Sequence, residues 1–163
     1  MKKLQNIIRN WAIADGNPEP EFIEYEEGVR SSYGFHSPNK HANYRMLIYC
    51  NEKTEIFTAY AYSPFEVPED RREEVGELFV RLNRQILMGN FDLDFSDGEV
   101  RFRAGMDVEG GELTQQMIDN LIGACVWCWE KHYQMIMDVA FGDTPAYVAV
   151  QEDGRYMRET VLQ

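Results

Sequence analysis

Two cysteines and a histidine near the end of the chain have the spacing of a thiol site. Cys125 and Cys128 form a C-x-x-C pair, and His132 follows the second cysteine by one helical turn. Such residues bind zinc or carry out thiol redox chemistry. However, the pair lies well inside a predicted helix, where the helix N-terminus cannot lower a thiol pKa, and no second C-x-x-C completes a zinc site. Buried core thiols are therefore the favoured interpretation, and a metal- or thiol-dependent redox protein remains the alternative.

The remaining candidates for chemistry are weaker. Asp92 to Gly98 begins like a calcium loop, but its glycine falls one position late and Arg103 stands where a bidentate glutamate is required. His36 and His41 are not spaced to form a catalytic set with a nucleophile and a carboxylate. No glycine-rich phosphate loop is present. We therefore expect no enzyme activity, no catalytic residue and no cofactor or metal.

Composition restricts the partners. The chain has 163 residues with a formal net charge of -12, and 44% of its residues are hydrophobic. A charge of this sign repels phosphate backbones and anionic lipids, so we expect neither nucleic acid nor a membrane as a partner. Three cysteines without framework spacing, and no apolar run typical of a signal peptide, predict a cytoplasmic protein.

The periodicity predicts an α+β fold with elements in the order α-β-β-β-α-β-β-α. Apolar residues at helical spacing predict a helix over 2–14, a second from Pro68 to Gly89, and a long third from Thr114 to Phe141. Residues 29–35, 44–50 and 55–62 favour strands, and 19–27 is interpreted as a linker or short edge segment. One antiparallel sheet of about five strands with the helices on one face would bury every apolar stripe.

The fourth and fifth strands are predicted as a hairpin over 91–104. Asp97-Gly98 separates two alternating segments, and a two-residue loop there would place Phe95 opposite Val100. The same register would pair Asp94 with Arg101 and Asp92 with Arg103. Asn83, beside the apolar stripe of the second helix, would be either a buried amide with local hydrogen bonds or a partly exposed helical residue.

Aromatic residues on both faces of the strands suggest a binding function. A sheet with helices on one face is expected to carry a polar second face, yet the second and third strands are apolar on both alternating sets. We therefore expect the other face or an edge to meet a protein, either a second copy in a homodimer or a partner segment. The candidate partner-binding residues are Tyr44, Tyr49, Phe57, Tyr60, Tyr62 and Phe65.

Several segments in order resemble the YbjN-domain family. They include Ser63-Pro64-Phe65-Glu66-Val67-Pro68, Leu82-Asn83, Gly89-Asn90-Phe91, Asp97-Gly98-Glu99-Val100-Arg101-Phe102-Arg103 and Leu113-Thr114. The family is described as bacterial sensory transduction regulators with a fold similar to type III secretion chaperones. The resemblance implies a cytoplasmic, non-enzymatic, protein-binding homodimer with a chaperone-like or regulatory role. It covers a single predicted domain over 1–142 and leaves 143–163 as an extension, a short helix or strand followed by a loose tail.

Overall fold

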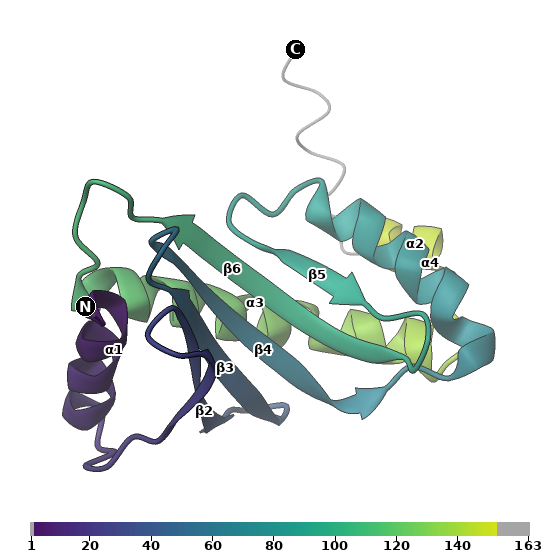
Figure 1. The fold of residues 1–163 in the computed structure, drawn as a ribbon. Coiled ribbons are helices and arrows are strands. Elements are labelled where there is room, and N and C mark those ends of the chain that lie inside the picture. Colours follow the sequence, from purple (N-terminus) through teal and green to yellow (C-terminus); the bar gives the residue numbers. More distant parts are fainter. Residues whose placement is uncertain (1, 153–163) are drawn as a thin grey trace.

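Six antiparallel strands form one sheet, and four α-helices lie on one side of it and around its ends (Figure 1). The structure is a computed structural model that describes residues 2–152. The strand order is β1-β2-β3-β4-β6-β5. The elements are α1 (Lys3–Ala14), β1 (Phe22–Glu26), β2 (Arg30–Pro38), β3 (Asn43–Asn51), β4 (Ile56–Glu66), a 3-10 turn (Glu69–Arg71), α2 (Arg72–Asn83), β5 (Asn90–Leu93), β6 (Glu99–Asp107), α3 (Gln115–Ala140) and α4 (Ala146–Glu152). The predicted α+β class and the one-sided helices are thereby confirmed.

The sixth strand comes from the segment interpreted as a linker or short edge segment. β1 pairs with β2, with Phe22 opposite Tyr33 and Ile23 opposite Ser32. The strand preference of β1 is weak because the strand is short and contains two of the five glutamates in residues 19–27. The pairing is also irregular between Glu24 and Glu26, where a bulge interrupts the register. β1 is consequently a short edge strand.

The helix α1 depends on a residue far away in the sequence for its first turn. The backbone N–H groups of Leu4 and Gln5 donate to the two carboxylate oxygens of Glu52, at 3.0 Å and 2.8 Å. A carboxylate at this position satisfies unpaired N–H groups and interacts favourably with the helix dipole. The Glu52 carboxylate therefore fastens α1 to the turn between β3 and β4.

The helix α2 ends earlier than its apolar stripe predicts. It stops at Asn83, and residues 84–89 form a loop in which Leu87 is fully exposed. The reason is tertiary: the chain must turn back so that the ring of Phe91 in β5 stacks on Phe79 of α2, with ring centres 5.1 Å apart.

The strand β4 also runs past Pro64 to Glu66, beyond the predicted end of the sheet structure.

The β5–β6 hairpin forms, but its predicted register is wrong by two residues. Leu93 lies opposite Val100 and Asp92 opposite Arg101, because the loop spans residues 95–98 and not Asp97-Gly98 alone. A shift of two residues keeps each side chain on its predicted face. It changes the ion pairs, so that Asp92 contacts both Arg101 and Arg103 and takes the place predicted for Asp94.

The core lies between the sheet and α3. Thr114 caps this helix as predicted, since its hydroxyl accepts from the backbone N–H of Met117. The fully buried indole of Trp129 donates to the carbonyl of Ala61 in β4 at 2.9 Å. The short helix α4 packs on α2 and α3 through the buried residues Ala146, Ala149 and Val150. The predicted tail from residue 153 onward lies outside the described residues.

Candidate functional site

The side of the sheet opposite α3 carries a row of tyrosine and arginine side chains. The buried sheet residues that contact helices, such as Phe57, Ala59 and Ala61, alternate along β4 with residues on this opposite side. In Figure 1 no helix of the described chain crosses this side of β4 and β6. We call it the open face, and define it by Ile23, Ser32, Gly34, Arg45, Leu47, Tyr49, Thr58, Tyr60, Tyr62, Arg101 and Arg103.

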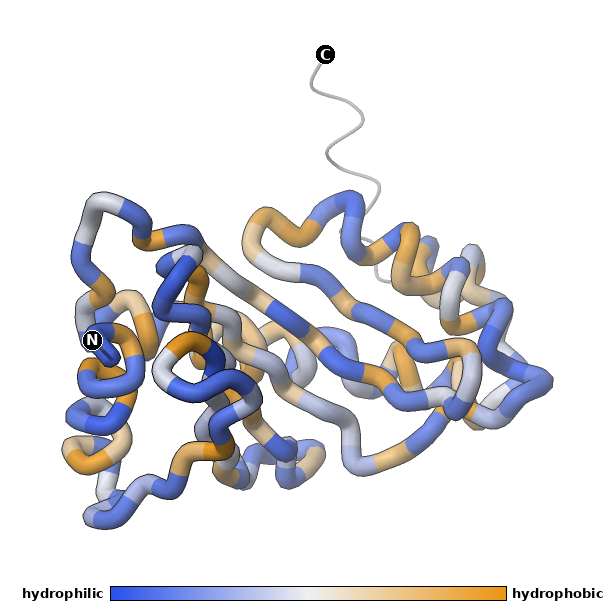
Figure 2. Tube along the Cα trace, viewed as in Figure 1, coloured by the Kyte–Doolittle hydropathy of each residue, from blue (hydrophilic) through white to orange (hydrophobic). Residues whose placement is uncertain are grey.

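Alternation along the strands produces this surface. Figure 2 shows hydrophilic and hydrophobic residues following one another along β5 and β6. In β3 and β4 the pattern differs, because Leu47 and Tyr60, which are paired across the strands, add apolar surface to the face that lacks a helix. Both side chains are partly buried by their neighbours. The open face is thus less polar than the solvent side of an ordinary antiparallel sheet.

Arginine side chains stack on the tyrosines of the open face. The guanidinium carbon of Arg45 lies 3.9 Å from the ring centre of Tyr62, and that of Arg101 lies 4.9 Å from the ring centre of Tyr60. These are cation–π contacts, in which each guanidinium group lies over a tyrosine ring. Burial raises the pKa of Tyr60. Its hydroxyl is therefore neutral at physiological pH and acts as a hydrogen-bond donor and acceptor.

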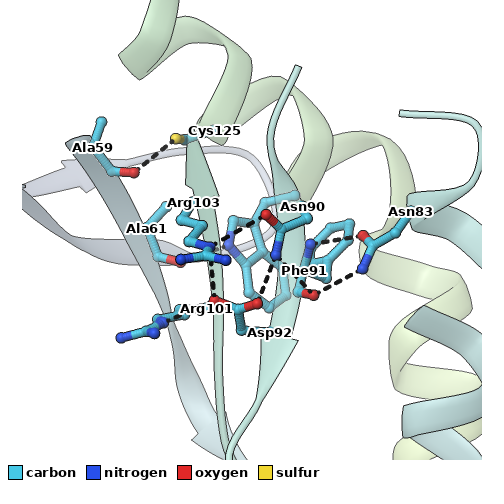
Figure 3. Close-up of polar contacts among 10 residues, drawn as sticks. Ala59, Ala61, Asn83, Asn90, Phe91, Asp92, Arg101, Arg103 and Cys125 are labelled. Atoms are coloured by element: carbon cyan, nitrogen blue, oxygen red, sulfur yellow. Dashed lines mark hydrogen bonds and ion pairs between the residues drawn. The ribbon is translucent and has the colours of Figure 1, made fainter. Parts of the chain in front are cut away.

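A shared carboxylate fixes two of the arginines. The Nε atoms of Arg101 and Arg103 each lie 3.2 Å from the same Oδ2 atom of Asp92 (Figure 3). The side chain of Asn90 completes the cluster by donating to Asp92 Oδ1 at 2.6 Å. Since both arginines use Nε for this ion pair, it leaves their terminal N–H groups for other contacts. The Asp92 carboxylate therefore fixes the positions of both arginine side chains on the open face.

A groove continues the open face beyond the hairpin. It has a volume of about 590 Å³ and lies between α2 and the strands β5 and β6. Val80 and Phe95, two exposed apolar side chains, line it together with Arg101 and Arg103. The groove thus combines apolar side chains with the two arginines and with the acidic residues Asp92, Asp94 and Glu99.

The six predicted partner-binding aromatic residues separate into two groups. Tyr49, Tyr60 and Tyr62 belong to the open face, where Tyr49 and Tyr60 are partly exposed and Tyr62 is 8% exposed beneath the Arg45 guanidinium. Tyr44 and Phe57 are 0% exposed beneath α3, so a partner cannot reach them. Tyr44 stacks on Trp129 with ring centres 5.5 Å apart and donates to the Glu130 carboxylate at 2.7 Å. We therefore assign both to the core and remove them from the candidate site.

Phe65, the sixth residue, also lies on the helix side. Its ring meets Trp129 edge-on, with 6.1 Å between centres, and contacts Tyr133 and Phe141 in the same manner. Phe65 is partly buried.

The arginines of the open face were not predicted as site residues. They are Arg45, Arg101 and Arg103, of which Arg101 and Arg103 share the Asp92 carboxylate. The available signal was the alternation of arginine with apolar residues in the strands.

The three residues of the candidate thiol site, Cys125, Cys128 and His132, are all buried. Burial raises the pKa of Cys125 to about 12 and that of Cys128 to about 11. The Cys125 thiol donates to the carbonyl of Ala59, and His132 Nδ1 lies 2.8 Å from the carbonyl oxygen of Cys128 (Figure 3 shows Cys125). Within residues 2–152, no three His, Cys, Asp or Glu side chains group as metal ligands. Reactive thiols have a lowered pKa, so these raised values favour the buried core thiols of the first interpretation.

The outer edge of β5 is closed by a side chain of α2. The amide of Asn83 donates to the carbonyl of Phe91 at 3.0 Å and accepts from the N–H of Phe91 at 2.8 Å (Figure 3). These two bonds reproduce those that a neighbouring strand would make. Asn83 combines the two alternatives: it is a partly exposed residue at the end of α2, and its amide makes local hydrogen bonds.

The fold defines the class of protein. It is similar to a chain in the crystal structure of the ExsC–ExsE complex, a type III secretion chaperone complex, with a TM-score of 0.60 and 14% sequence identity over 82% of this chain and 93% of that chain. The molecule therefore has a secretion chaperone-like α+β fold. Residues 23–127 match the YbjN family, described as "Putative bacterial sensory transduction regulator", and the chain belongs to this family.

No curated protein matches the sequence closely enough to serve as a relative. In the described part of the chain, none of the helices has the length and apolar character needed to cross a membrane.

Proposed function

We propose that this protein is a non-enzymatic, chaperone-like or regulatory module that binds a segment of a partner protein through the open face. The observation that carries the proposal is the row of Tyr49, Tyr60 and Tyr62 with Arg45 and Arg101 stacked on it. Tyrosine and arginine are enriched among the residues that dominate binding energy at protein interfaces. The structural neighbour, itself a complex of two proteins, supports the same proposal.

Cross-linking from defined positions tests this function. A photo-reactive phenylalanine analogue is placed at Tyr49 or Tyr60 of the full chain, and at Gln134, an exposed residue of α3, as the control. After irradiation in cells, we expect cross-linked partner from the two open-face positions and little from Gln134. Equal cross-linking from all three positions, or none from Tyr49 and Tyr60, would contradict the proposal.

We also propose that the chain acts as a homodimer in the cytoplasm, with an apolar patch on α3 and the α2–β5 loop as the contact. A groove of about 450 Å³ lies there, with Trp127 59% exposed beside the exposed Leu87 and Met88. Among the described residues that line it, Lys131 is the one lysine or arginine, and none is an aspartate or glutamate. This depletion of charge is typical of interface cores.

Sedimentation velocity at micromolar concentration tests the dimer. The expected result is a dimer for the unaltered protein and a monomer for Trp127→Lys. The control is Tyr147→Lys, because Tyr147 is also exposed but lies on α4, away from the groove. A monomeric unaltered protein would exclude the dimer, and a dimeric Trp127→Lys variant would exclude this contact.

The proposed location in the cytoplasm is supported by the thiols. Cys50, Cys125 and Cys128 are buried and form no disulfide, which is consistent with a reducing compartment.

A further inference from the structure

The two edges of the sheet are finished in different ways. At β5 the amide of Asn83 occupies both outward-facing backbone groups of Phe91. At the other edge, β1 pairs with β2 alone, and no further strand of the described chain lies beyond it. In an edge strand, alternate N–H and C=O groups point away from the sheet and can pair with another strand. The edge at β1 is therefore the one where backbone pairing is available.

The side chains of β1 join this edge to the open face. Ile23 is 63% exposed and Tyr25 is 55% exposed. The Tyr25 hydroxyl shares a hydrogen bond with Ser32, and its ring centre lies 6.3 Å from that of Tyr49. A strand added along β1 would therefore place every second side chain beside an apolar part of the open face.

The same edge is strongly acidic. Residues 19–27 contain five glutamates and no basic residue, and all five glutamates are exposed. Three cations lie beside this segment: Lys2 pairs with Glu24, Arg30 Nε lies 3.0 Å from Glu26 Oε2, and Arg9 contacts the ring of Phe22. Five negative charges against three positive ones leave a negative excess at the edge.

The negative charge of this edge affects an approaching strand according to the charge of that strand. Charged side chains and bulges are devices by which edge strands avoid pairing with other copies of themselves. Here the glutamates repel a second acidic copy, since each chain carries a net charge of -12. They do not repel a cationic segment, which the same charges attract.

We propose that the β1 edge binds an extended partner segment in which apolar and basic side chains alternate, by adding it as a seventh strand. The apolar side chains lie beside Ile23 and Tyr25 on the open face, and the basic ones lie beside Glu24 and the flanking glutamates. Backbone pairing supplies affinity, and the alternation supplies specificity. This inference rests on the proposed function, because it specifies the partner segment of the same surface.

Three blocked peptides serve as probes: acetyl-KVKYKVK-amide, its acidic counterpart acetyl-EVEYEVE-amide, and acetyl-KVKPKVK-amide. The last has the charge of the first, but proline removes a backbone N–H and disfavours a strand. With the full chain, we expect the first peptide to slow amide hydrogen exchange in residues 22–26 and not in β5. The proline peptide is expected to bind at least about tenfold more weakly, and the acidic peptide not to bind.

A matched pair of variants separates a local from a general charge effect. Glu26 and Glu77 each pair with an arginine four residues later, at Arg30 and Arg81, and both are exposed. Neutralising either removes the same charge and the same kind of ion pair. We expect Glu26→Gln to weaken binding of the first peptide about twofold to fivefold, and Glu77→Gln to leave the affinity within about 1.5-fold.

Several results would overturn the inference. These are equal binding of the lysine and proline peptides, equal effects of the two variants, no peptide binding, or protection confined to residues other than 22–26. Such results leave the proposed function standing if cross-linking from Tyr49 and Tyr60 succeeds. Conversely, protection of β1 together with failed cross-linking would refute the open face as the partner site and retain the edge.

Discussion

Replacing Asn83 by alanine tests how the sheet edge at β5 is held. The substitution removes both hydrogen bonds between the side-chain amide and the backbone of Phe91. Each such bond contributes a net of about 1 kcal/mol, so their loss costs about 2 kcal/mol. Alanine is a better helix former than asparagine by about 0.6 kcal/mol. The expected net decrease in the free energy of unfolding is therefore about 1.5 kcal/mol.

Urea unfolding followed by circular dichroism measures this change. With a slope of about 2 kcal/mol/M for a chain of this size, the midpoint is expected to fall by about 0.7 M. The control is Asn10→Ala, because Asn10 is exposed in α1 and the same helix-propensity gain applies without a bond to lose. That variant is expected to be slightly more stable than the unaltered protein, by about 0.5 kcal/mol.

A second measurement locates the effect. Amide hydrogen exchange of Phe91 is expected to accelerate in Asn83→Ala, because its N–H loses the side-chain acceptor. Equal unfolding free energies for the two alanine variants, within about 0.5 kcal/mol, would refute the reasoning. Unchanged exchange at Phe91 would refute it as well, since the amide would then not be what closes this edge.

Three other perturbations have defined outcomes. Arg71→Met removes guanidinium bonds of 2.9 Å and 2.6 Å to the carbonyl of Val139, and is expected to cost about 2 kcal/mol in urea unfolding; a cost below about 0.5 kcal/mol would contradict this role. Glu52→Gln removes the charge beside the α1 N-terminus and is expected to cost about 1 kcal/mol, with faster exchange in the first turn of α1 as the check. Burial raises the pKa of Cys125 from 9.0 to about 12, so the thiol ionises first in the unfolded chain, and the free energy of unfolding is expected to fall as the pH rises from 9 toward 12. Cys125→Ala is expected to reduce that slope, and an unchanged slope would argue against the thiol as its source.

The sequence was sufficient where local and tertiary preferences agree. The apolar spacing of Leu4, Ile8 and Trp11 predicts α1, and Thr114 marks the start of α3. Strand faces were also predictable, because side chains alternate with a fixed period of two and the pattern survives an error in register. This is why the β5–β6 hairpin kept its predicted faces although its loop is longer than the predicted two residues.

The remainder depended on contacts between distant segments. The end of α2 follows from the position of Phe91, which the helical stripe through Leu87 does not encode. The strand β1 is held by pairing with β2, and its glutamates mask the strand preference of Phe22 and Ile23. Alternation places Tyr44 and Tyr49 of β3 on opposite faces, but only the packing of α3 decides that the face of Tyr44 is the buried one.

The candidate site was predictable as a surface but not as an arrangement of charges. Aromatic residues on both faces of β3 and β4 predicted that the face opposite the helices, or an edge of the sheet, meets another protein. The stacking of Arg101 on Tyr60 requires β6 to lie next to β4, which is a crossover in the strand order and not a neighbour in the sequence. Single-sequence periodicity contains no information about that adjacency.

Both edges of the sheet have outward-facing backbone groups that could pair with another strand, and the chain protects the two edges in different ways. An amide such as that of Asn83 satisfies the backbone of β5 whatever molecule approaches, so that edge is closed to acidic and basic strands alike. Glutamates along β1 leave the outward backbone groups available and discourage only partners of the same sign. Protection by the glutamates therefore depends on the charge of the approaching strand: it acts against an acidic strand and not against a basic one. A chain of net charge -12 is thereby kept from pairing with itself at the edge where a cationic segment can still be added.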